Sequence, residues 1–313
     1  MPSHAETLCE ACGGTCRPFF CAGDVNRRIS NDLFEYFRCA ACGVVFLKDP
    51  PADLGRYYQS DYLAKPGSPG DLERIGRRMQ PKLDIVREFA HGDRLLEIGP
   101  GMGTFAWLAK SAGFAVDVIE QDEEACRFLE SAVHVGVTRS SSPEQVLAAS
   151  NRKYDVVTLW HSIEHLPAAW RTLTQAIRAL NEGGIMIVAT PNPSAWQFQH
   201  LGAKWPHVDA PRHLWLIPVN AMRRHAEQAG ADLIWSTTDD PEGRSWNQFG
   251  WSQSLRNLLP TAYRNSLVAR VASRAAGFVT ALAVRPWESK EFRGSAYTAV
   301  FRKRAGGNPE AIA

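Results

Sequence analysis

The sequence predicts an α/β fold with a mostly parallel, seven-stranded sheet covered by helices on both faces, preceded by a small cysteine-rich N-terminal module. Apolar runs alternate with helix-patterned segments between residues 94 and 303, and six of the seven cysteines lie before residue 43. Strands that alternate with helices are typical of a parallel sheet with helical crossovers. The length of 313 residues, with 45% hydrophobic and 22% charged residues, suits one large domain with a small appendage.

The N-terminal cysteines predict a structural metal site. Cys9 and Cys12 in CEACG, and Cys39 and Cys42 in CAACG, form two C-x-x-C pairs, each followed by a glycine that suits a tight turn. Four thiolates at this spacing match a tetrahedral Zn²⁺ site with every position filled, and the alternative is a set of reduced cysteines without a ligand. Clustered cysteines in a reducing compartment indicate metal binding rather than disulfides.

The segments around these cysteines suggest a ribbon. FEYFRC and GVVFL are expected to form strands of a hairpin, while Cys16 and Cys21 are left as spare thiols or alternative ligands. The expected domain boundaries are a zinc-ribbon domain at 1–50, a helical connector at 51–92, a sheet domain at 93–303 with insertions at about 193–217 and 241–295, and a tail at 304–313.

The remaining elements follow in order along the chain. Residues 72–90 have helical periodicity, with a break or a new first turn at Pro81. Strands are expected at 94–99, 114–120, 133–138, 154–160, 185–192, 232–237 and 296–303. Helices are expected near 104–112, 122–132, 167–180, 218–230 and 264–284.

Charge and hydropathy exclude several classes of protein. A formal net charge of +2 without a pronounced basic stripe gives no reason to expect a nucleic-acid partner. No signal peptide is expected, and the most apolar stretch, 267–284, carries Arg270 and Arg274, so no transmembrane span is expected and the location is predicted to be cytoplasmic. Helix 264–284 could instead pack on a lid, pair with another subunit or make a peripheral membrane contact. The oligomeric state is left open.

The run LLEIGPGMGTF predicts a cofactor site at the end of the first strand of the sheet. Glycines at 99, 101 and 103 let the backbone approach a ligand, and the following helix start offers free amides. The spacing differs from the dinucleotide fingerprint, and Glu97 would repel a pyrophosphate but attract an ammonium group. Glu120 ends the next strand, where a carboxylate can accept hydrogen bonds from two ribose hydroxyls.

Several motifs in order, ExGxGxG, the acid in VIEQD, YDVVTLWHSIEHL, NEGG and TPN, together resemble class I S-adenosylmethionine-dependent methyltransferases over about residues 93–240. The front end CxxC…CxxCGVVFLKDP and the later WPHVDAPRHLWLIP resemble a bacterial subgroup with an N-terminal zinc ribbon that often accompanies glycan or secondary-metabolite biosynthesis. The resemblance implies a Rossmann-like sheet and a small-molecule acceptor such as a sugar or metabolite.

The resemblance also implies a cofactor-binding set. The glycines would contact the methionine moiety, Glu120 the ribose and Gln121 the adenine, while Trp160 and His161 would face the sulfonium and the acceptor. In chain order the set is Glu97, Gly99, Gly101, Gly103, Glu120, Gln121, Ser141 or Ser142, Trp160 and His161.

The stretch WHSIEHL has three readings. His161, or His213 in PRHLW, could be the general base that takes the proton of an acceptor hydroxyl. Alternatively, His161, Glu164 and His165 could bind a second divalent metal, with His213 as a further candidate ligand. They resemble the Glu-x-x-Glu-His motif that holds Mg²⁺ in small-RNA 2′-O-methyltransferases and ubiquinone-pathway O-methyltransferases, but a histidine in the first position favours Zn²⁺, Mn²⁺ or Fe²⁺. In the third reading, Glu164 and His165 order the loop.

The sequence therefore predicts an enzyme that transfers a methyl group from S-adenosylmethionine to a small molecule, at a hydroxyl of a saccharide or secondary metabolite. The alternatives are an N- or C-methyltransferase acting on a nucleotide sugar, an inactive cofactor-binding zinc-ribbon adaptor and, disfavoured by the glycine loop, a nicotinamide oxidoreductase. Tryptophan faces in the two insertions could stack on a sugar ring or could be core residues. They are Trp196, Trp205, Trp215, Trp246, Trp251 and Trp287.

Overall fold

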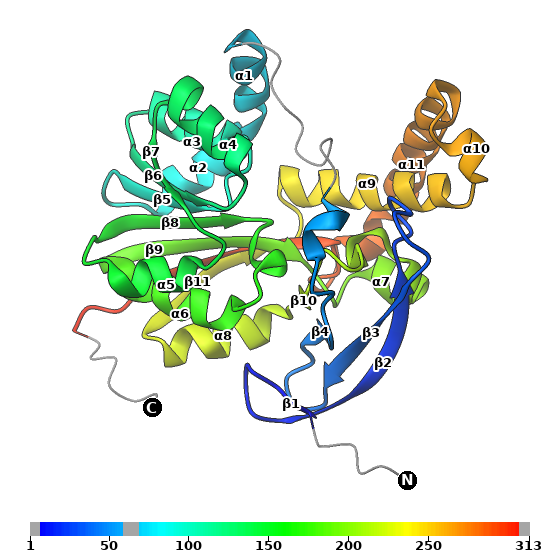
Figure 1. Ribbon diagram of the computed structural model, residues 1–313, viewed down its shortest axis with the longest axis horizontal. Helices are drawn as coiled ribbons and strands as arrows, with labels where there is room; N and C mark the ends of the chain where they lie inside the picture. The colour runs from blue at the N-terminus through cyan, green and yellow to red at the C-terminus, as the bar shows by residue number, and fades with distance from the viewer. Residues whose placement is uncertain (1–6, 59–68, 307–313) are drawn as a thin grey trace. The chain divides into compact units, whose positions relative to one another are not determined.

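A computed structural model describes residues 7–58 and 69–306, and contacts divide them into two compact units (Figure 1). We call them the ribbon unit and the sheet unit. The ribbon unit comprises residues 7–57, 190–222 and 237–298. The sheet unit comprises residues 58, 69–189, 223–236 and 299–306.

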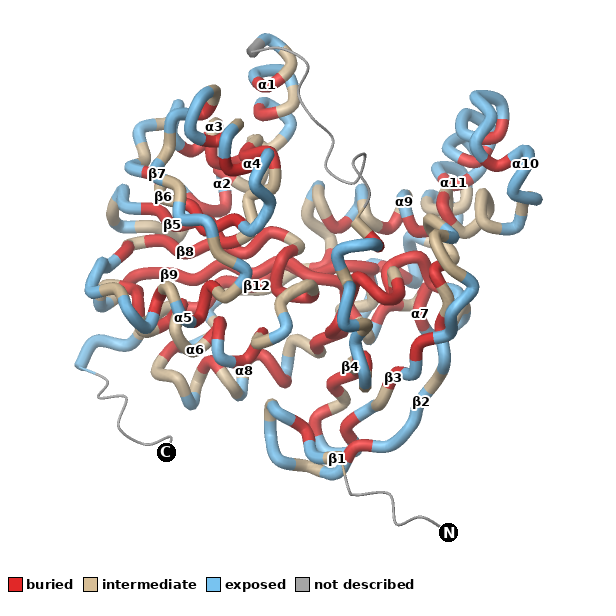
Figure 2. The backbone as a smooth tube through the Cα atoms, viewed as in Figure 1, coloured by how far each residue is buried: buried red, intermediate tan, exposed pale blue. Residues whose placement is uncertain are grey.

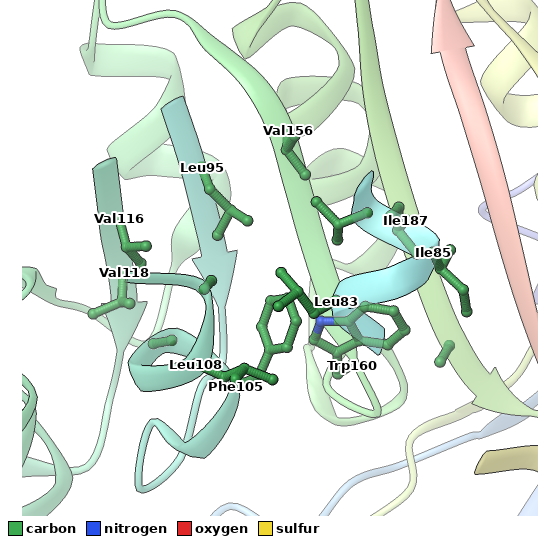
Figure 3. Packing of buried hydrophobic residues seen from close by; sticks show 14 of the residues in the cluster. Leu83, Ile85, Leu95, Phe105, Leu108, Val116, Val118, Val156, Trp160 and Ile187 are labelled. Carbon is green, nitrogen blue, oxygen red and sulfur yellow. The ribbon is translucent and has the colours of Figure 1, made fainter. Parts of the chain in front are cut away.

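The sheet unit is built on seven strands in the order β11-β12-β9-β8-β5-β6-β7, and the predicted α/β fold class is confirmed. The five strands from β9 to β7 pair in parallel, while the arrow of β12 runs against that of β9 (Figure 3). The strands are β5 (Arg94–Ile98), β6 (Ala115–Glu120), β7 (Gly136–Arg139), β8 (Tyr154–Trp160), β9 (Leu180–Pro191), β11 (Ala231–Thr237) and β12 (Ala296–Lys303).

Helices cover both faces of this sheet, as expected for parallel crossovers: α2, α3 and α4 lie on one side, and α5, α6 and α8 on the other (Figure 1). The helices are α1 (Pro69–Gly76), α2 (Gln80–Phe89), α3 (Thr104–Ser111), α4 (Glu123–Phe128), α5 (Pro143–Ala149), α6 (Ala169–Ala179) and α8 (Val219–Gln228). The expected break at Pro81 is confirmed, because a 3₁₀ turn (Arg77–Met79) ends at the start of α2 and the proline lies in its first turn.

The central strands are buried on both faces, which explains their continuous apolar sequences. In β8, Val156, Val157 and Leu159 are fully buried, and aliphatic side chains from β5, β6 and β9 belong to the same core cluster as Val156 (Figure 3). Burying each such side chain contributes roughly 1.5–3 kcal/mol. This core fixes the carboxyl ends of the strands, where ligands bind in open α/β sheets.

The ribbon unit contains a five-stranded sheet in the order β1-β2-β3-β4-β10, in which every pairing is antiparallel. The expected hairpin corresponds to β3 and β4, but β2 and β10 were not anticipated. The strands are β1 (Thr7–Leu8), β2 (Thr15–Gly23), β3 (Leu33–Cys39), β4 (Val45–Leu47) and β10 (Trp215–Leu216). Because β10 pairs with β4, the segment expected as an insertion completes the ribbon sheet.

The helices of the ribbon unit are α7 (Trp196–Leu201), α9 (Pro241–Asn257), α10 (Thr261–Arg264) and α11 (Leu267–Glu288). Asp240 caps α9 by accepting a hydrogen bond from the amide of Gly243 at 2.7 Å. The sequence indicated no helix here, because apolar and polar residues alternate without a clear helical face. By length and composition, α11 could cross a membrane, yet most of its apolar stretch is exposed (Figure 2).

The division into units differs from the expected domain boundaries. The insertions predicted inside the sheet domain, about 193–217 and 241–295, group by their contacts with the N-terminal ribbon. Two of their tryptophans, Trp205 and Trp215, are buried, and the Trp205 ring packs against Phe198 and His207. These two rings are therefore core residues of the ribbon unit, and the sugar-stacking interpretation is wrong for them.

Candidate active site

The glycine loop follows β5 in the sheet unit. Gly99, Gly101 and Gly103 have φ values of 72°, 55° and 68°, in the left-handed region that favours glycine. A Cβ on Gly99 would lie 2.7 Å from the Cβ of Ser162, whose hydroxyl donates to the carbonyl of Ile98 at 2.8 Å. The loop therefore needs glycine for both its backbone conformation and its close packing.

Substituting Gly103 with alanine is expected to destabilise the sheet unit. The new Cβ would lie 2.3 Å from Cδ2 of Leu129 and would hold a positive φ, so we expect the free energy of unfolding to fall by about 2–3 kcal/mol. Gly113→Ala is the matched control, because Gly113 also has a positive φ but no atom within 4 Å of its added Cβ. If urea unfolding showed equal losses of unfolding free energy for the two variants, the close packing at Gly103 would not account for the effect.

Glu97 is the most unusual group of this site. Its side chain is only 3% exposed, and its Oε2 atom has no hydrogen-bond partner among the described residues. Burial raises the pKa of Glu97 to about 8, the charge of Lys82 acts to lower it, and Glu120 acts to raise it. A buried carboxyl oxygen without a partner is costly, so the site fits a ligand that brings a donor, and an ammonium group would stabilise the anion.

Lys82 on α2 is a site residue that the sequence did not reveal. Its Nζ lies 4.8 Å from the centre of the Trp160 ring, and its charge favours the ionised form of Glu97. In the sequence, Lys82 looks like an ordinary polar position of an amphipathic helix. The structure instead places its positive charge beside the glycine loop, where it can interact with the negative end of a ligand.

Glu120 lies at the carboxyl end of β6 and is hydrogen-bonded to the glycine loop. Its Oε2 accepts a hydrogen bond from the amide of Gly101 at 3.0 Å, and its Oε1 accepts from the amides of Gln121 at 2.7 Å and Asp122 at 2.9 Å. Burial raises the pKa of Glu120, and these amides act to lower it. A carboxylate has about four acceptor positions, so capacity remains for a hydroxyl.

The two residues predicted beside the adenine lie on the surface of the sheet unit. Gln121 is exposed directly after β6, and Ser141 is exposed just before α5. Ser142 is partly buried, and its amide donates to the Ser140 hydroxyl at 3.0 Å. Their adenine contacts stay predictions.

Trp160 ends β8 as part of the apolar core (Figure 3). Its ring meets Phe105 of α3 edge-on at 5.4 Å, and its Nε1 atom is buried without a partner among the described residues. The ring therefore contacts Lys82 of α2 and Phe105 of α3, and its contact with the sulfonium stays a prediction.

His161 follows Trp160 with a φ of 51°, an uncommon conformation for a residue with a large side chain. Its amide donates to the carbonyl of Ala189 at 2.9 Å, which fixes it at the carboxyl end of β8. The Nδ1 atom lies 3.5 Å from Oε1 of Glu164, whose side chain is 1% exposed. Backbone strain of this kind often accompanies a functional role.

The expected helical face of His161, Glu164 and His165 is not formed as an α-helix, because Ile163–His165 is a 3₁₀ turn. His161 and Glu164 lie close together, and a ligand atom of His165 lies within 4.8 Å of one of Glu164. Nδ1 of His165 also faces the hydroxyl of Tyr58 at 3.1 Å, and a second metal at these residues stays a prediction. His213 belongs to the ribbon unit, where its Nδ1 faces the carbonyl of His207 at 2.8 Å. Catalytic roles for His165 and His213 stay predictions.

The four predicted metal ligands converge in the ribbon unit. The Sγ atoms of Cys9, Cys12, Cys39 and Cys42 lie within 4.8 Å of one another, with Cys9–Cys42 and Cys12–Cys39 distances of 3.6 Å. A tetrahedral Zn²⁺ site with bonds of about 2.3 Å places its sulfurs about 3.8 Å apart, so this donor set fits the ion. Gly13 and Gly43 have positive φ values, as expected for the turn after each pair.

The fold and the glycine loop with two buried acids define a class I S-adenosylmethionine-dependent methyltransferase, and comparison with known proteins supports this class. A family model described as a methyltransferase domain matches residues 71–235, more than half of the chain, and the chain belongs to this family.

Two relatives carry the name ubiquinone biosynthesis O-methyltransferase. The one from Cereibacter sphaeroides is 29% identical over 195 residues, which cover 58% of this chain and 75% of the relative. The one from Caulobacter vibrioides is 35% identical over 106 residues, which cover 32% of this chain and 42% of the relative.

Solved structures are also similar to this chain. An S-adenosylmethionine-dependent methyltransferase from Archaeoglobus fulgidus has a TM-score of 0.47 and 17% identity and covers 74% of this chain and 94% of its own. Another, from Mesorhizobium loti, has a TM-score of 0.47 and 13% identity and covers 74% of this chain and 100% of its own.

Proposed function

We propose that the protein methylates a hydroxyl group of a small molecule, a saccharide or secondary metabolite, with His161 as the general base. The observation that carries this proposal is the pairing of His161 with the buried Glu164 at the end of β8. A carboxylate beside Nδ1 favours the tautomer in which Nε2 can accept a proton. The name O-methyltransferase shared by the relatives supports oxygen as the acceptor atom.

Different residues of the sheet unit would bind the cofactor and accept the proton. Glu97 would bind the ammonium group of S-adenosylmethionine, and Glu120 would accept hydrogen bonds from its ribose hydroxyls. The bound molecule supplies an activated methyl group, so the protein mainly aligns acceptor and donor. His161 would take the proton as the acceptor oxygen becomes nucleophilic, and Glu164 would stabilise the resulting imidazolium.

The saccharide class rests on the resemblance of the cysteine-rich front end and of residues 205–218 to glycan-associated enzymes, because buried Trp205 and Trp215 cannot stack on a ligand. Mass spectrometry after incubation with S-adenosylmethionine and a panel of sugars, nucleotide sugars and phenolic metabolites tests the proposal. A mass gain of one methylene on an oxygen supports it. Methylation confined to nitrogen or carbon would contradict the hydroxyl acceptor, and turnover of no acceptor would favour a cofactor-binding adaptor. Such an enzyme would act in the cytoplasm.

We also propose that Cys9, Cys12, Cys39 and Cys42 bind a structural Zn²⁺ ion. Elemental analysis is expected to find about one zinc per chain, and Cys39→Ser is expected to lose it, because three thiolates hold the ion less tightly. Cys16→Ser is the matched control: Cys16 is also buried, but its Sγ faces the carbonyl of Gly14 at 3.6 Å. Equal zinc content in all three proteins would contradict the site.

A further inference from the structure

Most residues of α10 and α11 are exposed to solvent (Figure 2), and several of them are large and apolar. The exposed fractions are 80% at Leu258, directly after α9, 78% at Val268 and 76% at Leu267, and the other members are at least half exposed. We call the set the outer apolar face. Its members are Leu258, Tyr263, Leu267, Val268, Val271, Phe278, Val279 and Leu282. Large contiguous apolar surfaces of this kind mark interaction sites.

The opposite side of α11 packs on α9, and this contact fixes the direction of the outer apolar face. The buried residues Ala269, Ser273 and Gly277 of α11 are four positions apart, and buried Glu288 follows about three turns later, so all of them lie in one stripe. A Cβ on Gly277 would lie 2.5 Å from the backbone nitrogen of Ser252, so the two helices are in close contact. Val268, Val271, Val279 and Leu282 therefore point away from α9.

The charged residues of this region are all basic. Between residues 243 and 287 the sequence contains six arginines and no aspartate or glutamate. Arg270 and Arg274 are exposed on α11 and form no ion pair with a carboxylate among the described residues. Burial, followed by the charges of Arg270 and Arg274, lowers the pKa of Arg256 on α9, so the three guanidinium groups lie near one another. Such a cluster attracts anions.

We propose that the outer apolar face and the cluster of Arg256, Arg270 and Arg274 bind the surface of a membrane that contains anionic lipids. An interfacial helix typically places apolar side chains among the acyl chains and basic side chains at the headgroups. The region lies outside residues 71–235, which match the methyltransferase family model.

The charge distribution favours this partner over two others. A symmetric dimer through the same face would bring arginine clusters of like charge together. A nucleic acid would neutralise the arginines but leave the apolar side chains exposed. A helix that crosses the bilayer would have to give up its contact with α9 and carry Arg270 and Arg274 inside, so α11 lies along the membrane surface.

Vesicle sedimentation with the full-length protein tests this proposal. The protein is expected to sediment with phosphatidylcholine vesicles that contain phosphatidylglycerol, more weakly with phosphatidylcholine alone, and less at high salt. Arg270→Gln/Arg274→Gln is expected to weaken binding by roughly thirtyfold, given about one factor of five per arginine. Val271→Ser/Val279→Ser is expected to weaken it as well, and both double variants should keep the native circular dichroism because the four side chains are exposed.

Arg87→Gln/Arg171→Gln is the matched control, because it removes two exposed arginines from α2 and α6 of the sheet unit. This variant is expected to bind vesicles as the unchanged protein does. Three results would overturn the proposal: no binding to anionic vesicles, equal weakening by the control, or a dimer that Val271→Ser/Val279→Ser dissociates without any vesicle binding. Retention in cell membranes after an alkaline carbonate wash would also overturn it, in favour of a spanning helix.

Discussion

Glu97→Gln is expected to bind S-adenosylhomocysteine about thirtyfold more weakly than the unchanged protein, a loss of about 2 kcal/mol. The amide keeps the shape of the side chain but cannot become an anion beside the ligand's ammonium group. Glu97 is 3% exposed, and burial raises its pKa to about 8, so near neutral pH the free protein holds a neutral carboxyl. The glutamine side chain is similar to that neutral carboxyl in shape and charge, so we expect thermal stability near pH 7 to change little.

The same carboxyl predicts a pH dependence of binding. An ammonium group favours the anion, so the ligand must displace a proton from Glu97 at any pH below about 8. Affinity is therefore expected to rise by up to about tenfold per unit between about pH 6 and 7.5. Calorimetry in buffers of different ionisation enthalpy measures the proton release directly. Release that persists unchanged in Glu97→Gln would assign the proton to another group.

His161→Ala is expected to lower kcat by about 10²–10⁴-fold, the usual contribution of a general base. The affinity for S-adenosylhomocysteine should change by less than about threefold, because the acid pair Glu97 and Glu120 is untouched. Glu164→Gln should lower kcat less and shift its pH profile, because its carboxylate would no longer stabilise protonated His161.

His134→Ala is the control for this experiment, since His134 also has a positive φ, 58°, but is exposed at the end of a π-helical turn. It separates the effect of placing alanine at a positive φ from the loss of the His161 imidazole. Comparable losses of turnover and cofactor affinity in His161→Ala would contradict its role as the base.

The sheet unit could be predicted from the sequence because its central strands are buried on both faces. The run from Tyr154 to Trp160 is a mostly apolar segment, and no loop pattern competes with it. The glycine loop and Glu120 could also be predicted from the sequence, since short-range spacing defines them. The role of Lys82 could not be predicted, because its place beside Glu97 depends on how α2 packs rather than on any motif.

The ribbon unit was harder to predict because long-range pairing builds it. Strand β10 has only two residues, and Trp215 pairs with Phe46 from a distant part of the chain. Pro18 interrupts the pattern of β2, where the pairing register shifts. A strand this short acquires its structure from its partner, so local sequence carries little signal for it.

Titration of the purified full-length protein with S-adenosylhomocysteine, with NAD as the control ligand, tests the assignment of the cofactor site most directly. The orphaned Oε2 of Glu97 and the amide-bound Glu120 predict a dissociation constant on the order of micromolar for S-adenosylhomocysteine and no measurable binding of NAD. Binding of NAD, or of neither ligand, would contradict the assignment of this loop to S-adenosylmethionine.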